Sequence, residues 1–406
     1  MILYILMTAL TIGLAWLVVS EPCRAKAPQG SGGLQDSVAP GLVQTQKRSP
    51  AAGGLNRRQA FNLVCLTGIF LVLAGVSALR LEVGNDYGKY VDIFHEIHAG
   101  TDEAYVVTEA GFNFVVDAVY TLSGFENYLL VFAIFGAATA FVFLKAMYDQ
   151  SVDFKISFAM FMLLGLYFRT FTTVRYYFVL ALTLYSLRYV QRKEFGKFLL
   201  LILFAALFHK SVLVALVLYP LAHVRWNRGV MIFGTVAAAA VFVLQKPILQ
   251  LALLLYPTFE DTVYLSQGIG LLANASGILR CLFVFGLALL CRKESLEGDG
   301  MLQRQNRFYL KLSVFGFLLY TCGSFLPLVS RIAYYVVTPQ ILLVPGLLFG
   351  VKDEKKKKLV FLLAAIFCLL YFAYFLKTAS GSGIRVLPYK TWIFHEKEWI
   401  NGSDFF

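Results

Sequence analysis

The chain has 406 residues, of which 59% are hydrophobic and only 15% are charged, and its formal net charge is +12. This composition excludes an ordinary soluble domain and indicates an integral membrane protein. The basic excess would suggest nucleic-acid binding in a soluble protein. Here it lies mostly in loops on one side of the predicted membrane domain, so we expect no nucleic-acid partner.

The N-terminal part divides into three segments. Residues 1–20 are predicted to form a first transmembrane helix that is retained, because no basic residues precede the apolar run and no clean cleavage site follows it. Residues 21–59 are basic and rich in Gly, Ser and Pro, which predicts a flexible cytoplasmic loop. Apolar runs then recur over residues 60–377, which we interpret as one polytopic membrane domain.

The first crossing of this domain, at residues 60–79, leads to a polar outer loop at 80–108. The next segment, Glu109–Phe125, is short and carries Asp117, so we expect an interfacial or re-entrant helix. Three crossings are then predicted at residues 127–147, 156–172 and 175–190.

Phe195–His223 contains two apolar runs of about a dozen residues that meet at His209-Lys210-Ser211. Each run rises only about 20 Å, which is too short for a hydrocarbon core of roughly 30 Å. A straight helix through both would bury an imidazole and an ammonium near mid-depth. Because basic residues flank both ends of the segment, we predict a re-entrant hairpin that enters from the cytoplasm and has His209 and Lys210 at its tip.

The remaining crossings are predicted at 229–245, 273–290, 308–326, 332–350 and 359–377. A short apolar piece at 248–256 is expected to lie in the interface. Residues 378–406 are predicted to form an extracytoplasmic tail. The predicted fold is therefore an all-α polytopic helix bundle with about eleven spans plus the hairpin. This orientation places two thirds of the 36 lysines and arginines on the inner side, as the positive-inside rule requires.

Several cationic residues break that rule and lie at outer helix ends or in tight outer turns: Arg80, Arg169, Arg175, Arg331, and His209 with Lys210. Arginine presents a rigid donor fork that matches phosphate oxygens. Tyrosines follow two of these arginines and can stack on sugar rings. A single arginine such as Arg169 is more often a bilayer anchor, and an aromatic belt needs only a membrane. Taken together, the cations favour a site for a lipid-linked phosphate.

Acid–base candidates lie on the same side. A carboxylate or a neutral imidazole near a sugar hydroxyl can act as general base, and His209 is the preferred candidate because cationic neighbours keep it neutral. Asp86 is the second candidate, and pairing with Arg80 is its alternative role. His95 and His98 lack a clear third ligand, so we expect no metal site there.

The order of five short motifs resembles the EpsG family of Wzy-like exopolysaccharide polymerases, over most of the chain from residue 60. The motifs are VGNDYGKY after Arg80, EAGFNFV at 109–115, VRYYFVLAL with RKEFGKF and ALFHKSVLVAL, SRIAYYV, and LPY at 387–389. Two departures stand out: Tyr176 follows Arg175 where members commonly have Gln, and the loop at 26–55 is unusually long.

The resemblance implies polymerisation of oligosaccharide repeat units carried on undecaprenyl diphosphate, at the outer face of a bacterial inner or plasma membrane, with no cofactor. His209 and Asp86 would be the catalytic residues. The predicted substrate-binding residues are Arg80, Arg175, Arg331, Arg169, Lys210, Tyr87, Tyr90, Tyr176 and Tyr334. The expected partners are the lipid-linked oligosaccharide, the bilayer, and a flippase and a chain-length regulator of the same pathway.

Other functions fit the same residues. A polysaccharide or lipid-linked sugar transporter would show internal repeats and charges along a central path, whereas this chain shows no repeat and its charges gather at one depth. A ligase or single-addition glycosyltransferase would differ only in its acceptor. A non-catalytic scaffold of an export complex is a fourth possibility.

Overall fold

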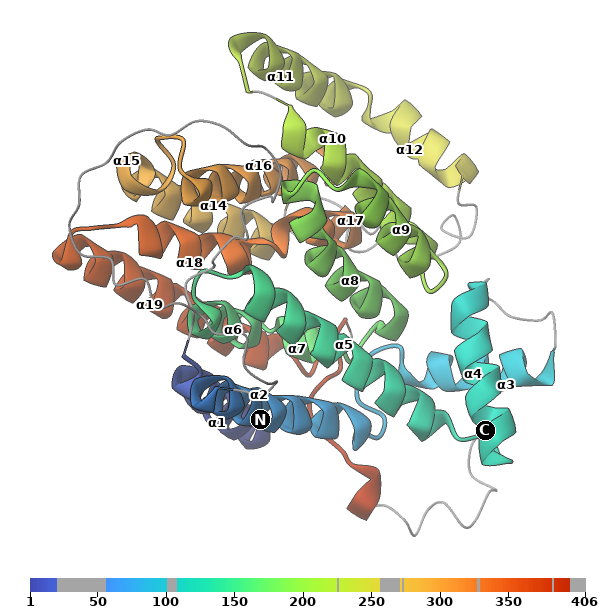
Figure 1. The fold of residues 1–406 in the computed structure, drawn as a ribbon. Helices are drawn as coiled ribbons and strands as arrows, with labels where there is room; N and C mark the ends of the chain where they lie inside the picture. The colour runs from blue at the N-terminus through green and yellow to red at the C-terminus, as the bar shows by residue number, and fades with distance from the viewer. Residues whose placement is uncertain are drawn as a thin grey trace, which may run out of the picture.

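The computed structural model describes residues 1–19, 56–100, 108–224, 226–255, 271, 274–326, 329–381 and 383–394. Most of the predicted loop at 21–59 and the end of the tail therefore lie outside the described residues. Within them the chain is helical, with an isolated β-bridge between Arg80 and Thr391 (Figure 1). The all-α class is thus confirmed.

The elements, in chain order, are α1 (Ile2–Leu17), α2 (Arg57–Ala78), α3 (Tyr87–Ala99), α4 (Ala110–Ser123), α5 (Tyr128–Gln150), α6 (Phe154–Leu163), α7 (Leu166–Arg169), α8 (Val174–Gln191), α9 (Phe195–Ala206), η1 (Lys210–Val217), α10 (Leu218–His223), α11 (Arg228–Val243), α12 (Gln245–Leu255), α14 (Ala275–Leu290), α15 (Arg292–Ser295), α16 (Met301–Cys322), α17 (Val329–Val337), α18 (Gln340–Gly350), α19 (Glu354–Thr378) and η3 (Trp392–Phe394).

Four helical segments of the described chain are long and apolar enough to cross a membrane: Arg57–Ala78, Tyr128–Gln150, Val329–Gly350 and Glu354–Thr378. A fifth is added if α11 and α12, which meet at 78°, count as one span. Several further apolar helices are shorter. The figure of about eleven spans therefore stays a prediction.

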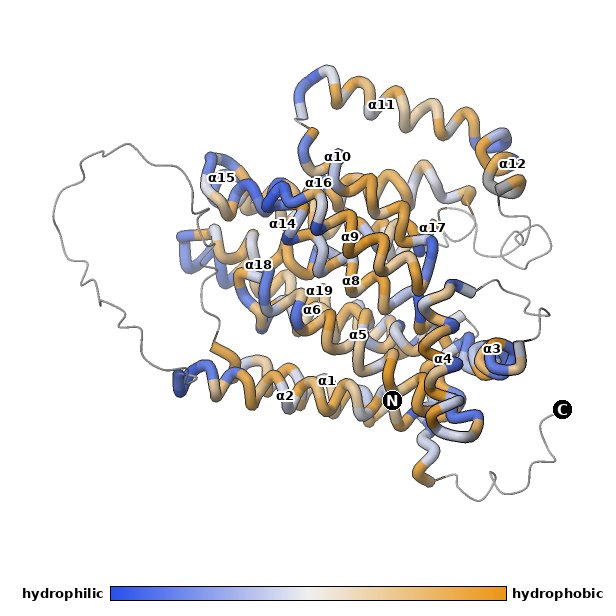
Figure 2. The backbone as a smooth tube through the Cα atoms, turned by 45° about the vertical axis from the view of Figure 1, so that its right-hand side comes forward, coloured by the Kyte–Doolittle hydropathy of each residue, from blue (hydrophilic) through white to orange (hydrophobic). Residues whose placement is uncertain are grey.

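Hydropathy along the backbone separates two sides of the molecule. Figure 2 shows that the hydrophilic start of α2, the short α15 and the connection between α18 and α19 gather at one side, and that α3 and α4 lie at the opposite side. The first side carries the basic loops that the sequence assigns to the cytoplasm. The bundle therefore has the charge asymmetry of a membrane protein.

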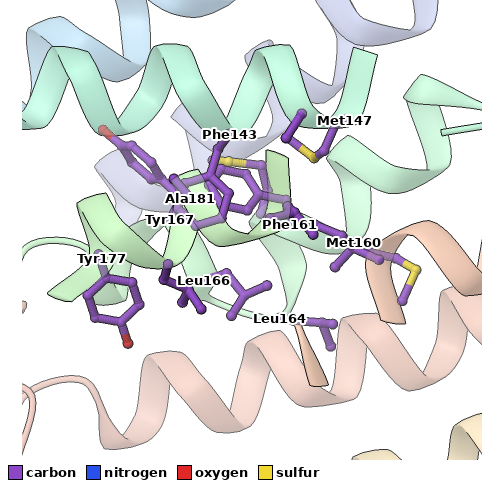
Figure 3. Close-up of a cluster of buried hydrophobic side chains, with 14 of the residues drawn as sticks. Phe143, Met147, Met160, Phe161, Leu164, Leu166, Tyr167, Tyr177 and Ala181 are labelled. Carbon is purple, nitrogen blue, oxygen red and sulfur yellow. The ribbon is translucent and has the colours of Figure 1, made fainter. Parts of the chain in front are cut away.

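The core joins α5, α6, α7 and α8. Figure 3 shows Phe143 and Met147 of α5 beside Phe161 of α6 and Tyr167 of α7. The rings of Phe143 and Phe161 lie 4.8 Å apart. The predicted crossing at 156–172 is not one helix, because Gly165 adopts a left-handed conformation (φ +69°) between α6 and α7. This break turns α7 back into the core and leaves Arg169 at its end.

The segment around His209 turns back on itself, as predicted. The α-helix α9 ends at Ala206, His209 is extended (φ −162°), and η1 and α10 return along α9. The ring of Tyr219 in α10 lies 4.8 Å from Phe195 and 5.8 Å from Phe198, both in the first turn of α9. The two arms are therefore antiparallel, and the tip of the hairpin is the chain around His209.

Candidate functional site

A polar cavity of about 230 Å³ opens between the start of α3, the α7–α8 connection and the start of α17. It is lined by Asn85, Asp86, Arg169, Thr172, Thr173, Tyr176, Tyr177, Ser330, Arg331, Tyr334 and Gly383. Five of the predicted site residues are among them: Asp86, Arg169, Tyr176, Arg331 and Tyr334. These residues come from distant parts of the sequence, so the fold, and not local sequence, assembles the cavity.

A close approach of two loops positions Asp86. Gly84 has φ +113°, and a Cβ at this position would overlap the carbonyl group of Phe171. Only glycine allows the outer loop to lie so near the α7–α8 connection. Thr173 Oγ1 then donates a hydrogen bond to Asp86 Oδ2 at 3.0 Å. The α7–α8 connection therefore holds the Asp86 carboxylate at the wall of the cavity, although Asp86 itself lies at the start of α3.

The C-terminal segment fixes the same loop. The backbone N–H of Gly84 donates to the carbonyl of Arg385 at 2.9 Å, and that of Leu81 donates to Lys390 at 3.0 Å. Tyr4 in α1 in turn donates its hydroxyl proton to Val386 O at 2.7 Å. The two ends of the described chain thus hold the loop that carries Asp86.

The two arginines of the cavity have no anionic partner among the residues that the structure describes. Neither Arg169 nor Arg331 forms an ion pair with a carboxylate of the residues that the structure describes, and Nε of Arg169 is buried without a hydrogen-bond partner. The guanidinium of Arg169 lies 5.6 Å from the ring of Phe375. Arg331 is held through its backbone, whose carbonyl accepts a hydrogen bond from Tyr176 at 2.6 Å. The cavity therefore combines two unpaired cations with one carboxylate, Asp86.

Beside the cavity, Glu109 joins α4, α8 and the hairpin tip. Its Oε2 accepts a hydrogen bond from Arg175 Nη1 at 2.6 Å. Its Oε1 accepts one from the backbone N–H of Lys210 at 2.9 Å and lies 3.4 Å from His209 Nδ1. The N–H groups of Gly111 and Phe112 donate to Leu207 O. The start of α4 therefore binds the hairpin tip at two points, at Leu207 before His209 and at Lys210 after it.

These contacts shift two ionisation equilibria. Burial raises the pKa of Glu109, but the interactions with His209, the Lys210 N–H and Arg175 outweigh it, so the net pKa lies below the ordinary value. Burial lowers the pKa of His209, and the neighbouring cations Arg175 and Arg331 add to this effect against the opposing pull of Glu109. Glu109 is therefore ionised and His209 neutral at neutral pH, as predicted for the imidazole.

Tyr176 separates the cavity from this cluster. It lines the cavity, and its ring lies 6.1 Å from the ring of His209 and 5.6 Å from that of Tyr335. The hydroxyl groups of Tyr335 and Ser211 lie 2.9 Å apart and share a hydrogen bond. His209 thus lies behind an aromatic wall of the cavity, and Asp86 lies in the wall itself.

Three other predicted residues lie in the aromatic core. Arg80 is 1% exposed, and its guanidinium lies between the rings of Phe132 and Phe171 at 4.9 and 5.0 Å. Tyr87 stacks on Phe132 with a centroid distance of 4.5 Å. Tyr90 is buried against Phe94 and Phe112. None of the three lines the cavity.

The remaining polar candidates make contacts outside the cavity lining. Lys210 engages Glu109 through its backbone, and its side chain is exposed. His95 Nδ1 lies 2.9 Å from a carboxylate oxygen of Glu126, and His98 Nδ1 lies 2.9 Å from one of Asp117. Among the described residues, no three histidines, cysteines or acidic groups are placed to bind a metal ion together.

Sequence reasoning missed Arg280 and the specific role of Glu109. Arg280 lies in α14, and its guanidinium is 5.5 Å from the ring of Tyr334, a residue of the cavity wall. The signal was present, because an arginine inside an apolar run is costly and usually functional. From the sequence, Glu109 is only the start of a short predicted helix and of the EAGFNFV motif, since its pairing with Arg175 depends on tertiary packing.

Comparison with known proteins identifies one family. The model of the EpsG family matches residues 63–391, which include the cavity, the Glu109 cluster and the hairpin. No curated protein and no solved structure matches the chain.

Proposed function

Because the chain belongs to the EpsG family, we propose that it is a membrane polymerase that joins oligosaccharide repeat units carried on undecaprenyl diphosphate, at the outer face of the bacterial inner or plasma membrane. The proposal extends to exopolysaccharide, capsule or O-antigen as product. The lipid-linked oligosaccharide is the substrate. A flippase and a chain-length regulator are the partners that such a pathway requires.

The observation that carries the proposal is the pair of unpaired arginines, Arg169 and Arg331, in a polar cavity. Buried or half-buried cations normally have a carboxylate partner. In this protein Arg175 pairs with Glu109, and Arg188 pairs with Asp149. Two guanidinium groups that have no carboxylate partner among the described residues are suited to bind an anionic ligand. A diphosphate supplies more than one negative charge on adjacent groups, and both arginines can bind it through paired N–H donors.

The reaction needs little beyond binding, charge stabilisation and one proton acceptor. The hydroxyl oxygen of the acceptor sugar forms a bond with the anomeric carbon of the donor glycan. The bond between that carbon and the diphosphate oxygen breaks, and the electron pair leaves with the diphosphate. Arg169 and Arg331 stabilise the negative charge that develops on the leaving group, which is the largest contribution such groups make.

In this proposal Asp86 accepts the hydroxyl proton; its support is that Asp86 is the carboxylate among the described lining residues and that Thr173 donates a hydrogen bond to it. His209 and Glu109 act from behind Tyr176, where they hold the hairpin tip, and with it Tyr335, against the cavity wall. Tyr176, Tyr177 and Tyr334 provide aromatic surface for sugar rings.

The test uses the purified full chain in lipid nanodiscs with lipid-linked repeat units. A ladder of products supports a polymerase. One added unit indicates a ligase or single-addition transferase, and no product together with flux across sealed vesicles indicates a transporter; either result overturns the proposal. Asp86→Asn and Arg331→Gln should remove the ladder. Arg188→Gln is the matched control, because Arg188 pairs with Asp149 away from the cavity.

A further inference from the structure

Arg280 is a buried cation for which the described part of the chain provides no polar partner. It lies in the second turn of α14, is 2% exposed, and forms no hydrogen bond or ion pair with the residues that the structure describes. Its Nε is fully buried. The contact that the structure gives its guanidinium is with the face of the Tyr334 ring, at 5.5 Å.

An aromatic ring compensates only part of such a burial. A cation–π contact is a weak interaction compared with the cost of removing a guanidinium from water. The other buried arginines have more support, since Arg175 has a carboxylate and Arg80 lies between two rings. Arg280 has one ring and no carboxylate among the described residues. The site around it is therefore incomplete without an anion.

The position of Arg280 connects it to the cavity. The ring of Tyr334 lines the cavity and also faces Arg280. Tyr177, Arg169 and Arg331 line the same cavity. Two cations therefore line the cavity and a third lies behind its Tyr334 wall, and the cavity contains one carboxylate, Asp86, among its described lining residues.

We infer that Arg280 is the third cation of this anion site and makes the cavity select diphosphate over monophosphate. This inference rests on the proposed function, because it concerns the group that carries the glycan. The field of a cation behind the Tyr334 wall acts on any anion in the cavity, and its effect grows with the charge of that anion. Two arginines suffice for one phosphate group. A third arginine favours a ligand with two phosphate groups.

Equilibrium binding of inorganic pyrophosphate and of inorganic phosphate to the purified full chain tests this inference. The wild-type protein should prefer pyrophosphate. Arg280→Gln should weaken pyrophosphate binding about tenfold and phosphate binding less, so that the preference falls. Arg188→Gln should leave both affinities unchanged, because Arg188 lies in the last turn of α8, whereas the α8 residues that line the cavity lie in its first turn. An unchanged preference in folded Arg280→Gln overturns the inference.

Thermal unfolding of each variant separates binding from folding. If Arg280→Gln does not fold, Arg280→Lys decides, since it keeps the charge but loses the planar fork. Folded Arg280→Lys should keep the pyrophosphate preference, and loss of that preference overturns a role based on charge. The assay contains no sugar. A pyrophosphate preference without a glycan ladder would therefore refute only the proposed function, and a ladder with an unchanged preference in Arg280→Gln would refute only the role of Arg280.

Discussion

Arg175 Nη1 and Glu109 Oε2 lie 2.6 Å apart, and each of the two side chains is 7% exposed. The pair joins the first turn of α8 to the N-terminal end of α4. The same carboxylate binds the backbone of Lys210 at the hairpin tip. One ionised group therefore ties together α4, α8 and the hairpin tip, and of these α8 contributes Tyr176 and Tyr177 to the cavity wall.

Replacement of Glu109 by Gln should destabilise the protein strongly. The buried guanidinium of Arg175 would lose its counter-charge, and breaking a buried pair from one side costs about 3–5 kcal/mol. The double variant Glu109→Gln with Arg175→Met should recover part of this loss, because no unpaired charge remains. Thermal and chemical unfolding in detergent measure both. If Glu109→Gln, Arg175→Met and the double variant all lose the same stability, the ion pair is not the source of the loss.

Acidification should destabilise the fold in two steps. The folded-state pKa of His209 lies below its ordinary value of 6.5, so the unfolded chain binds the proton first and stability falls as pH decreases below about 6.5. The pKa of Glu109 is also lowered, so its stabilising effect is present above its unfolded pKa, roughly 4.3, and is lost as pH falls through the folded value. Unfolding temperatures measured from pH 8 to pH 4 should show both losses of stability, first that from His209 and then that from Glu109.

The His209→Gln variant isolates the first step. The glutamine side chain at position 209 cannot be protonated. Between pH 7 and pH 5.5 the variant should therefore lose less stability than the wild-type protein. Other histidines, such as His95 and His98, are partly exposed and pair with carboxylates. Equal losses in the wild type and in His209→Gln would show that His209 is not the source of the acid sensitivity.

The hairpin is the part of the fold that sequence predicts best. Its two apolar runs are too short to span, and basic residues flank both ends, so only a return to the same side satisfies both facts. Residues His209 and Lys210 are therefore at the tip. The break at Gly165 is different, because a single glycine within an apolar run does not show whether the helix continues.

Sequence identifies which residues of the site are unusual but not which of them meet. The predicted topology gives Arg169 and Arg331 the same outer depth, and the structure shows that both line the cavity. Arg80 has the same predicted depth, yet its side chain turns into the core between Phe132 and Phe171. Side-chain direction at a helix end depends on the neighbouring helices, which one sequence does not specify.

Gly111→Ala should disturb the contact between α4 and the hairpin. A Cβ at position 111 would lie 2.8 Å from Cβ and 2.9 Å from the carbonyl oxygen of Leu207, so the two backbones must separate. We expect a loss of about 1–3 kcal/mol, typical of overpacking, together with lower polymerisation. Gly196→Ala is the control within the hairpin, because no atom lies within 4 Å of its Cβ and alanine favours helix. Similar losses in the two variants would argue against a specific close approach.

Arg80 and Arg331 should respond in opposite ways to substitution. Burial lowers the pKa of Arg80 to about 10, so it stays charged at neutral pH, and two rings stack on it. Arg80→Gln should therefore lower the unfolding temperature and the amount of protein in the membrane, because it removes both stacking contacts and leaves a poorly packed space. Any loss of polymer should follow the loss of folded protein.

Arg331 is half-buried at the cavity and makes its described polar contact through its backbone carbonyl, so Arg331→Gln should leave folding nearly unchanged. The same substitution should lower the rate of polymerisation by about 10²–10³, the range observed when one charge-stabilising group is lost. Arg331→Lys should recover only part of the rate, since an ammonium keeps the charge but not the paired N–H donors. The measurements are initial rates per folded molecule and unfolding temperatures for all three variants. A destabilised Arg331→Gln with a normal rate per folded molecule would assign Arg331 to structure, and Arg169 and Arg280 would remain as the cations of the proposed anion site.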